Sequence, residues 1–164
     1  RADNVDDTTH TPVKIAASSA ATDAFMLQER PDTLWLTGVQ RSVEKALQSA
    51  GLDKRDIDLF ELHDAYTILS ALTLEAAGFA DRGKGWQHAP ENTIALNGLL
   101  PVSTFGGLKS RGNPAGATGI YQAVEAVLQL RGMAGDNQVP NAKTAMIQNL
   151  GGLGSTVFTH ILQV

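Results

Sequence analysis

The C-terminal part of the chain most constrains the fold, because one clear helical segment is followed there by two strands around a glycine turn. Residues 117–132, ATGIYQAVEAVLQLRG, have a helical period that ends at Gly132. The residues that follow this period are Ile120, Val124, Val127, Leu128 and Arg131. TAMIQNLG (144–151) and STVFTHILQV (155–164) have the β-branched and apolar pattern of strands. A closing hairpin of this kind predicts a sheet with an antiparallel part.

Strands and helices alternate upstream of this hairpin. VKIAAS (13–18) and DIDLFEL (56–62) are predicted strands, and LPVSTFGG (100–107) is a short one. Residues 30–52 contain a helix that Asp32 or Thr33 caps and Gly51 ends, and residues 65–79 contain another that ends at Gly78. Residues 79–100 form a long loop, with room for a short hairpin. We therefore expect an α/β domain over residues 13–164, with a mixed sheet of about five strands layered with helices, after a polar leader over residues 1–12.

Composition narrows the classes of function. The 164 residues are 43% hydrophobic and carry a net charge of −4, which is typical of a folded domain and argues against nucleic acid as a partner. No apolar run approaches the length of a membrane span, so we expect no membrane-spanning segment and a cytoplasmic protein. The absence of cysteine excludes disulfides and thiolate metal sites in this chain, and we expect no metal.

The first candidate site is FELHDAYT (60–67), where a predicted strand ends at His63 and a helix begins. The carboxyl ends of strands in α/β sheets face the usual ligand crevice. A helix N-terminus also disfavours the protonated imidazole, which keeps a neutral base available. The structural alternative is that His63 and Asp64 only form a helix cap, with Asp64 as the capping acid.

Three glycine-rich stretches are further candidates. GNPAGATG (112–119) offers backbone N–H groups to an anion or oxyanion, although its glycines also suit a tight turn. QNLGGLGS (148–155) allows close backbone approach or is a plain hairpin turn. In STFGGLKSRG (103–112), Lys109 and Arg111 either meet phosphates or are ordinary solvated charges.

Together these stretches resemble the C-terminal half of a thiolase. ELHDAYT, then LPVSTFGGLKSRGNPAGATGIYQ, then QNLGGLGSTVFTHIL follow the order and comparable spacing of the family from about Val13 to Val164. The resemblance is nearest to the sterol-carrier-protein-2-type and archaeal-type branch, which includes acetyl-CoA acetyltransferases. It implies a five-layer αβαβα superfamily fold, of which this chain is one βα half that faces a similar N-terminal half in a dimeric enzyme.

The resemblance also implies roles for particular residues. His63 matches the histidine of the His-Asp-x-Phe motif, which helps to form an oxyanion hole for a thioester carbonyl, and Tyr66 holds the aromatic place. Asn113 stands where the family has the histidine of Gly-His-Pro, and Asn149 stands where Cys-x-Gly thiolases keep a second cysteine. Both positions depart from the family, and the amide of Asn113 cannot act as a general base near pH 7. A His and Asn pair with the cysteine elsewhere also resembles the Cys-His-Asn set of initiating ketoacyl synthases and hydroxymethylglutaryl-CoA synthase, in which both side chains donate to a thioester oxygen. The glycines expected to lie against the CoA thioester are Gly106, Gly107, Gly112 and Gly152.

Three functions follow from the resemblance and its departures. The first is the C-terminal catalytic half of an acyl-CoA acyltransferase of lipid metabolism, with a CoA thioester as substrate, no tightly bound cofactor and a nucleophilic cysteine outside this chain. This half is expected to be inactive alone and to belong to a homo-oligomer. The second is a retro-aldol lyase that acts with an OB-fold partner, with Tyr66 or Tyr121 as proton carrier. The third is a non-catalytic subunit that binds a CoA thioester or serves as a scaffold.

Overall fold

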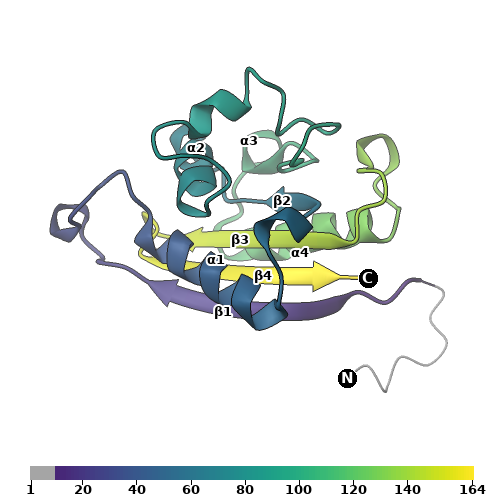
Figure 1. The fold of residues 1–164 in the computed structure, drawn as a ribbon, viewed down its shortest axis with the longest axis horizontal. Coiled ribbons are helices and arrows are strands. Elements are labelled where there is room, and N and C mark those ends of the chain that lie inside the picture. The colour runs from purple at the N-terminus through teal and green to yellow at the C-terminus, as the bar shows by residue number, and fades with distance from the viewer. Residues whose placement is uncertain (1–9) are drawn as a thin grey trace.

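The computed structural model describes residues 10–164, and the polar leader predicted over residues 1–12 therefore falls largely outside the described residues. A mixed sheet of four strands in the order β1-β4-β3-β2 forms the centre (Figure 1). The strands are β1 (Lys14–Thr22), β2 (Leu59–Glu61), β3 (Thr144–Gly151) and β4 (Thr156–Gln163). β4 pairs antiparallel with both β1 and β3, whereas β2 is parallel to β3. The predicted α/β class and mixed sheet are confirmed.

The predicted fifth strand is not formed. Within residues 100–107 only Val102 joins the sheet, through an isolated parallel bridge to Phe60. The backbone turns immediately afterwards, because Ser103 adopts a φ of 46° and accepts a hydrogen bond from the Gly106 N–H. Pro101 lacks the N–H that a strand would use on one side. The 79–100 segment also contains no strand, and folds into turns around a short 3-10 helix at Gly85–His88.

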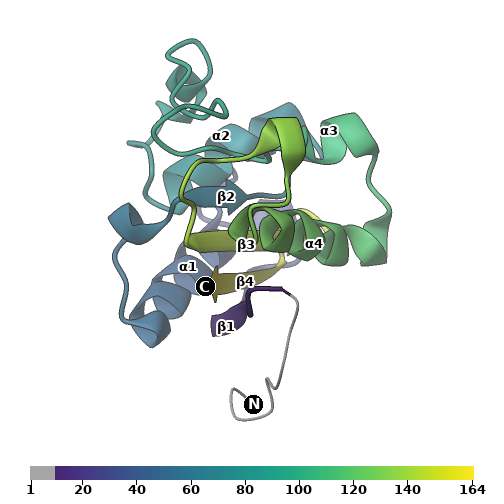
Figure 2. The same cartoon turned by 90° about the vertical axis from the view of Figure 1, so that its right-hand side faces the viewer.

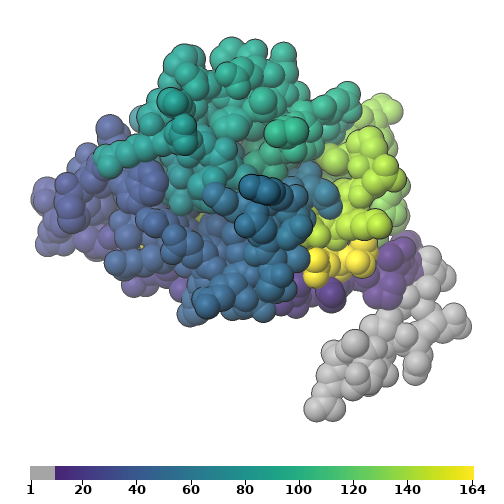
Figure 3. Space-filling view, in the orientation of Figure 1, coloured from purple at the N-terminus to yellow at the C-terminus, as the bar shows by residue number. Residues whose placement is uncertain are grey.

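Helices cover the two faces of the sheet unequally. α1 (Thr37–Ala50) packs on β1 and β4, and α2 (Thr67–Ala76) lies beside α1. α4 (Thr118–Leu130) packs mainly on β3 from the other face, and the short α3 (Gly107–Arg111) precedes it (Figure 2). Neighbouring residues of β3 consequently enter different cores, with Met146 packed on the α1 side and Ile147 on the α4 side. Residues 79–100 extend the surface above α1 in the space-filling view (Figure 3).

The start of α1 differs from the sequence prediction. Leu36 is its N-terminal flanking residue, and neither Asp32 nor Thr33 caps the helix. Asp32 instead accepts a hydrogen bond from the Leu34 N–H, which stabilises the preceding turn. The predicted end at Gly51 is confirmed, because this glycine adopts a left-handed φ of 67° and its N–H bonds to the last turn of the helix.

α4 forms where its period predicts it, but its apolar residues do not all face the core. Ile120 is 68% exposed and Val124 is 53% exposed. The buried side of the helix carries Gln122, Glu125 and Gln129 as well as small and aliphatic residues. These polar side chains are buried because they bind backbone carbonyls and side chains of the segments that α4 crosses.

Candidate active site

The ends of β2 and β3 bring His63 and Asn149 together. The two strands are parallel, with Glu61 beside Ile147, so the residues two positions further on share the face that α4 covers. The Asn149 Nδ2 atom lies 3.3 Å from the His63 Nδ1 atom, across 86 residues of sequence. The first turn of α4 packs against this pair, since a Cβ added to Gly119 would lie 3.8 Å from the Cβ of Asn149.

The surroundings of His63 favour the neutral form of its imidazole. The side chain is buried, and burial lowers the pKa of His63 below its usual range. Asp64 opposes this effect, whereas Arg111 adds to the lowering of the pKa of His63. A neutral imidazole offers one N–H donor and one acceptor nitrogen, and the N–H suits hydrogen bonding to a thioester oxygen.

Asp64 does not cap the helix that follows it. Tyr66 flanks the start of α2 and makes no side-chain cap. The Asp64 carboxylate instead accepts hydrogen bonds from the Leu108 N–H at 2.8 Å and the Lys109 N–H at 3.4 Å, and so caps α3. The sequence identifies Asp64 as a capping acid but assigns it to the wrong helix, because the helix that it caps begins 43 residues later in the chain.

Asn113 lies in the loop before α4 and is exposed. Its Oδ1 atom accepts hydrogen bonds from the Thr118 hydroxyl at 2.7 Å and the Ala115 N–H at 3.2 Å. The carbonyl end of the amide therefore stabilises the entry into α4. Within residues 10–164, the side chain bonded to His63 is that of Asn149, and Asn113 makes no hydrogen bond to His63.

The remaining predicted residues surround this region with different degrees of exposure. Tyr66 is 64% exposed beside the end of β2. The ring of Tyr121, the other tyrosine considered, stacks beneath the Arg111 guanidinium, 5.5 Å from its central carbon. The four predicted glycines all have positive φ angles. They are Gly106, Gly107, Gly112 and Gly152. Packing also favours glycine at position 107, since a Cβ there would lie 2.5 Å from an Asp64 carboxylate oxygen.

A buried charged cluster beside His63 was missed by the sequence analysis. Glu61 accepts a hydrogen bond from the Thr104 N–H at 3.1 Å, and Arg111 donates to Glu125 at 2.8 Å. Burial first and then the charge of Glu125 raise the pKa of Glu61 to about 8. Arg111 is thus a paired, largely buried cation and not a solvated charge. The sequence carried one sign of this cluster. Gln122 and Glu125 lie three residues apart in the predicted helix and therefore share one of its faces.

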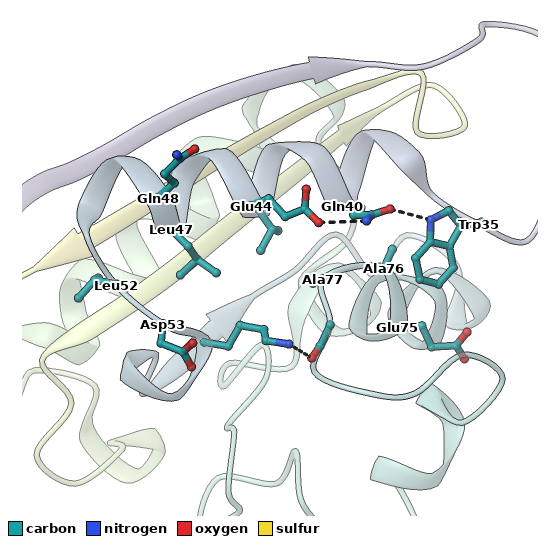
Figure 4. A pocket seen from close by; sticks show the side chains of 13 residues that line it. Trp35, Gln40, Glu44, Leu47, Gln48, Leu52, Asp53, Glu75, Ala76 and Ala77 are labelled. Carbon is teal, nitrogen blue, oxygen red and sulfur yellow. Dashed lines mark hydrogen bonds between the residues drawn. The ribbon is translucent and has the colours of Figure 1, made fainter.

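Two hollows lie away from these residues. A groove between α1 and α2 has a volume of about 460 Å³ and is lined by Trp35, Gln40 and Glu44 among others (Figure 4). Its polar groups bind one another, because Gln40 accepts from the Trp35 ring N–H and donates to Glu44. A second hollow of about 780 Å³ lies beside His88. None of the residues predicted for the site lines either hollow.

The chain is an α/β half in which a buried histidine lies at a strand end and a glycine-rich stretch leads into a helix. Residues 5–164 match the family described as "Thiolase C-terminal domain-like", and the chain belongs to this family. The resemblance stated from the sequence is therefore confirmed. No helix within residues 10–164 is long and apolar enough to cross a bilayer.

Two relatives support the predicted branch. The chain is 41% identical over 160 residues to an acetyl-CoA acetyltransferase of Methanothermobacter thermautotrophicus, covering 98% of this chain and 42% of that protein. It is 38% identical over 150 residues to sterol carrier protein 2 of Homo sapiens, covering 90% of this chain and 27% of that protein. The chain thus spans less than half the length of these relatives.

Two solved structures share the fold. The structure named "Ltp2-ChsH2(DUF35) aldolase" matches with a TM-score of 0.81 and 22% identity, covering 94% of this chain and 40% of that chain. A monomeric SCP2-thiolase like protein type 1 from Mycobacterium smegmatis matches with a TM-score of 0.66 and 20% identity, covering 92% of this chain and 29% of that chain. Both contain the fold of this chain as less than half of their own length.

Proposed function

We propose that the chain is the C-terminal catalytic half of a thiolase-like acyltransferase, which forms or cleaves C–C bonds in CoA thioesters. The observation that carries this proposal is the buried His63, whose pKa is lowered by burial and whose ring is held by Asn149 where two parallel strands end. In this role His63 donates an N–H to the thioester oxygen while negative charge develops there. The nucleophilic cysteine comes from outside this chain, which contains no cysteine.

The proposed substrate and partners follow from the same role. The substrate is a CoA thioester, with no tightly bound cofactor, and the glycine-rich loops allow its close approach. The N-terminal thiolase half covers α4, a partner that the exposed Ile120 and Val124 support. The complete protein is a homo-oligomer. The acetyl-CoA acetyltransferase relative supports the reaction class, since it is similar over 98% of this chain.

A second candidate is a retro-aldol lyase that acts on CoA thioesters with an OB-fold partner. The observation that favours it is Asn113, an amide that cannot act as a base and whose oxygen already accepts two hydrogen bonds. The exposed phenol of Tyr66 is then the proton carrier. The fold likeness to an aldolase is consistent with this candidate.

The first test measures thiolysis of acetoacetyl-CoA by the complete protein that carries this chain. His63→Ala should lower turnover by about 10²–10³, the usual loss when one oxyanion donor is removed. Asn113→Ala should lower it similarly if its amide donates to the thioester oxygen. His88→Ala is the matched control, because His88 lies beside a hollow that contains none of the site residues. Unchanged turnover in His63→Ala would contradict the proposed site.

Asn113→His tests whether Asn113 is a working hydrogen-bond donor or marks a lost activity. If Asn113 marks lost acyltransferase activity, the histidine restores a general base and thiolysis rises. If Asn113 is a working donor, in an acyltransferase or in the lyase, the same substitution lowers the native reaction. A complete protein that binds a CoA thioester but catalyses neither thiolysis nor aldol cleavage would instead be a binding or scaffold subunit.

A further inference from the structure

The side-chain amide of Gln122 has one chemically permitted orientation. Its nitrogen lies 3.2 Å from the Glu61 backbone oxygen and 3.0 Å from the Gln148 backbone oxygen. Backbone carbonyls only accept hydrogen bonds, so the NH₂ group must face them. Gln122 is fully buried, and the two carbonyls belong to the neighbouring strands β2 and β3. Helix α4 is thereby joined to the sheet directly below the candidate site.

The orientation of Gln122 determines that of Asn149. With its nitrogen committed to the strands, Gln122 presents its Oε1 atom to Asn149 at 3.1 Å. An oxygen acceptor requires a donor opposite it, so the NH₂ group of Asn149 must face Gln122. The same NH₂ group lies 3.3 Å from the His63 Nδ1 atom.

The orientation of Asn149 in turn determines which nitrogen of His63 carries the proton. An NH₂ group can only donate, so Nδ1 must be the acceptor nitrogen and the ring proton must be on Nε2. The adjacent Asp64 does not compete for Nδ1, because its carboxylate caps α3. The backbone of two strands therefore specifies the histidine tautomer through two amides.

We propose that Gln122 is a positioning residue which, through Asn149, holds His63 in the Nε2–H tautomer and so aims its single N–H at the substrate. The catalytic consequence rests on the proposed function of His63 as a donor to a thioester oxygen. The tautomer itself does not depend on that function. A second consequence is that Nδ1 is occupied, so His63 has no free acceptor nitrogen for a substrate proton.

The test is the ¹⁵N chemical shifts of the His63 ring, measured by NMR in the complete protein that carries this chain, with selectively labelled histidine. The wild type should show a protonated Nε2 and an unprotonated Nδ1. In Gln122→Met, of similar length, Asn149 is free to rotate, and the ring should become a mixture of the two tautomers. An Nδ1–H tautomer in the wild type, or an unchanged ring in Gln122→Met, would overturn the proposal.

Gln129→Met is the matched control. Gln129 lies on the same helix, is equally buried and also donates to a backbone carbonyl, that of Asn137. It makes no hydrogen bond to Asn149 within residues 10–164. This variant should lose comparable stability and keep the wild-type ring spectrum. The same change of tautomer in Gln129→Met would show a general loosening of α4 and would overturn a specific role for Gln122.

Asn149→Asp provides an independent variant if Gln122→Met does not fold. A carboxylate at this position can only accept, so the proton should move to Nδ1, and the pKa of His63 should rise. Turnover should then fall by up to about 10⁴-fold, the size of effect known when a catalytic histidine is held in the wrong tautomer. A proton that stays on Nε2 alone in Asn149→Asp would overturn the proposal.

Activity measurements distinguish the two proposals. If the ring shifts respond as expected but His63→Ala leaves turnover unchanged, the positioning by Gln122 stands and the proposed function fails. If His63→Ala abolishes turnover but Gln122→Met leaves the ring shifts unchanged, the proposed function stands and the positioning role fails. A fall in kcat with little change in KM in Gln122→Met supports both.

Discussion

Glu61 shows how one buried residue can couple the fold to pH. The side chain has no exposed surface, and its Oε1 atom accepts a hydrogen bond from Thr104, while Oε2 has no partner within residues 10–164. Burial and the charge of Glu125 raise the pKa of Glu61 to about 8, although Arg111 and the Thr104 hydrogen bonds oppose them. The carboxyl group of Glu61 is therefore mostly protonated at neutral pH, close to the ion pair of Glu125 with Arg111.

This raised pKa predicts a specific dependence of stability on pH. Between the ordinary pKa of 4.5 and the folded value of about 8, the folded state holds a proton that the unfolded state has released. Stability should thus fall as pH rises through this window, by up to about 1.4 kcal/mol per pH unit. The slope due to Glu61 should vanish below the window and above it, where the accumulated loss of stability remains. Glu61→Gln, a permanent analogue of the protonated acid, should remove this slope.

The measurement compares denaturant unfolding of the wild type and Glu61→Gln at a series of pH values, in the protein that carries this chain. The difference in unfolding free energy between them should move in favour of the variant from pH 5 to pH 8. Glu44→Gln, at an exposed position of α1, is the control and should keep the pH slope that Glu61→Gln removes. Parallel pH curves for Glu61→Gln would show that Glu61 is ionised in the folded state.

At the level of secondary structure, the local sequence pattern predicted where the helices and strands form. It did not predict which residues they contact in the folded chain. The helical period predicted α1, α2 and α4, and the β-branched and apolar runs predicted the four strands β1 to β4. The period of α4 could not reveal that Gln122 faces inward, since its partners are backbone carbonyls of strands 61 and 26 residues away in sequence. The family motif identified His63 and Asn149, but their 3.3 Å contact depends on the parallel pairing of β2 and β3. The burial of Glu61 could not be predicted from the sequence for the same reason, because it also depends on how the chain folds in three dimensions.

The capping of α3 by Asp64 gives a prediction at the same level. Gly107→Ala should destabilise the protein beyond the about 1–2 kcal/mol expected for a left-handed alanine, because the new Cβ would also displace the Asp64 carboxylate from the α3 N–H groups. Gly51→Ala is the control, with a similar φ of 67° and no atom within 4 Å of the added Cβ. Thermal unfolding should show the larger loss for Gly107→Ala. Equal losses would show that the cap contributes little.

In the molecule as a whole, helices cover one face of the sheet more completely than the other. α1 and α2 bury one side of the sheet, whereas α4 lies over β3 and leaves much of β4 and β1 open on the other side (Figure 2). Phe158 of β4 is beside Asn149 in the sheet register and is 46% exposed. Together with Ile120, Tyr121 and Val124 of α4, it gives this face an apolar character that is typical of an interface.

The chain studied alone should therefore associate and bind a hydrophobic dye. Ile120→Lys combined with Val124→Lys should reduce both effects without loss of helix content, because these side chains are exposed and make no core contact that the fold needs. Analytical sedimentation and dye fluorescence provide the measurements. A monomeric wild-type chain with no dye binding would contradict an uncovered interface on this face.

The place of β4 in the sheet has a consequence for synthesis of the chain. β1 and β3 both pair with β4, so β1, the first described strand, has no neighbour in the sheet until Thr156–Gln163 has been made. The Ser19 hydroxyl illustrates the separation, since it bonds to the carbonyl of a residue 140 positions later. Translation at about 5–20 residues per second leaves β1 unpaired for on the order of ten seconds. The sheet therefore assembles late on the ribosome, and an unpaired β1 is exposed to chaperones or to aggregation throughout that interval.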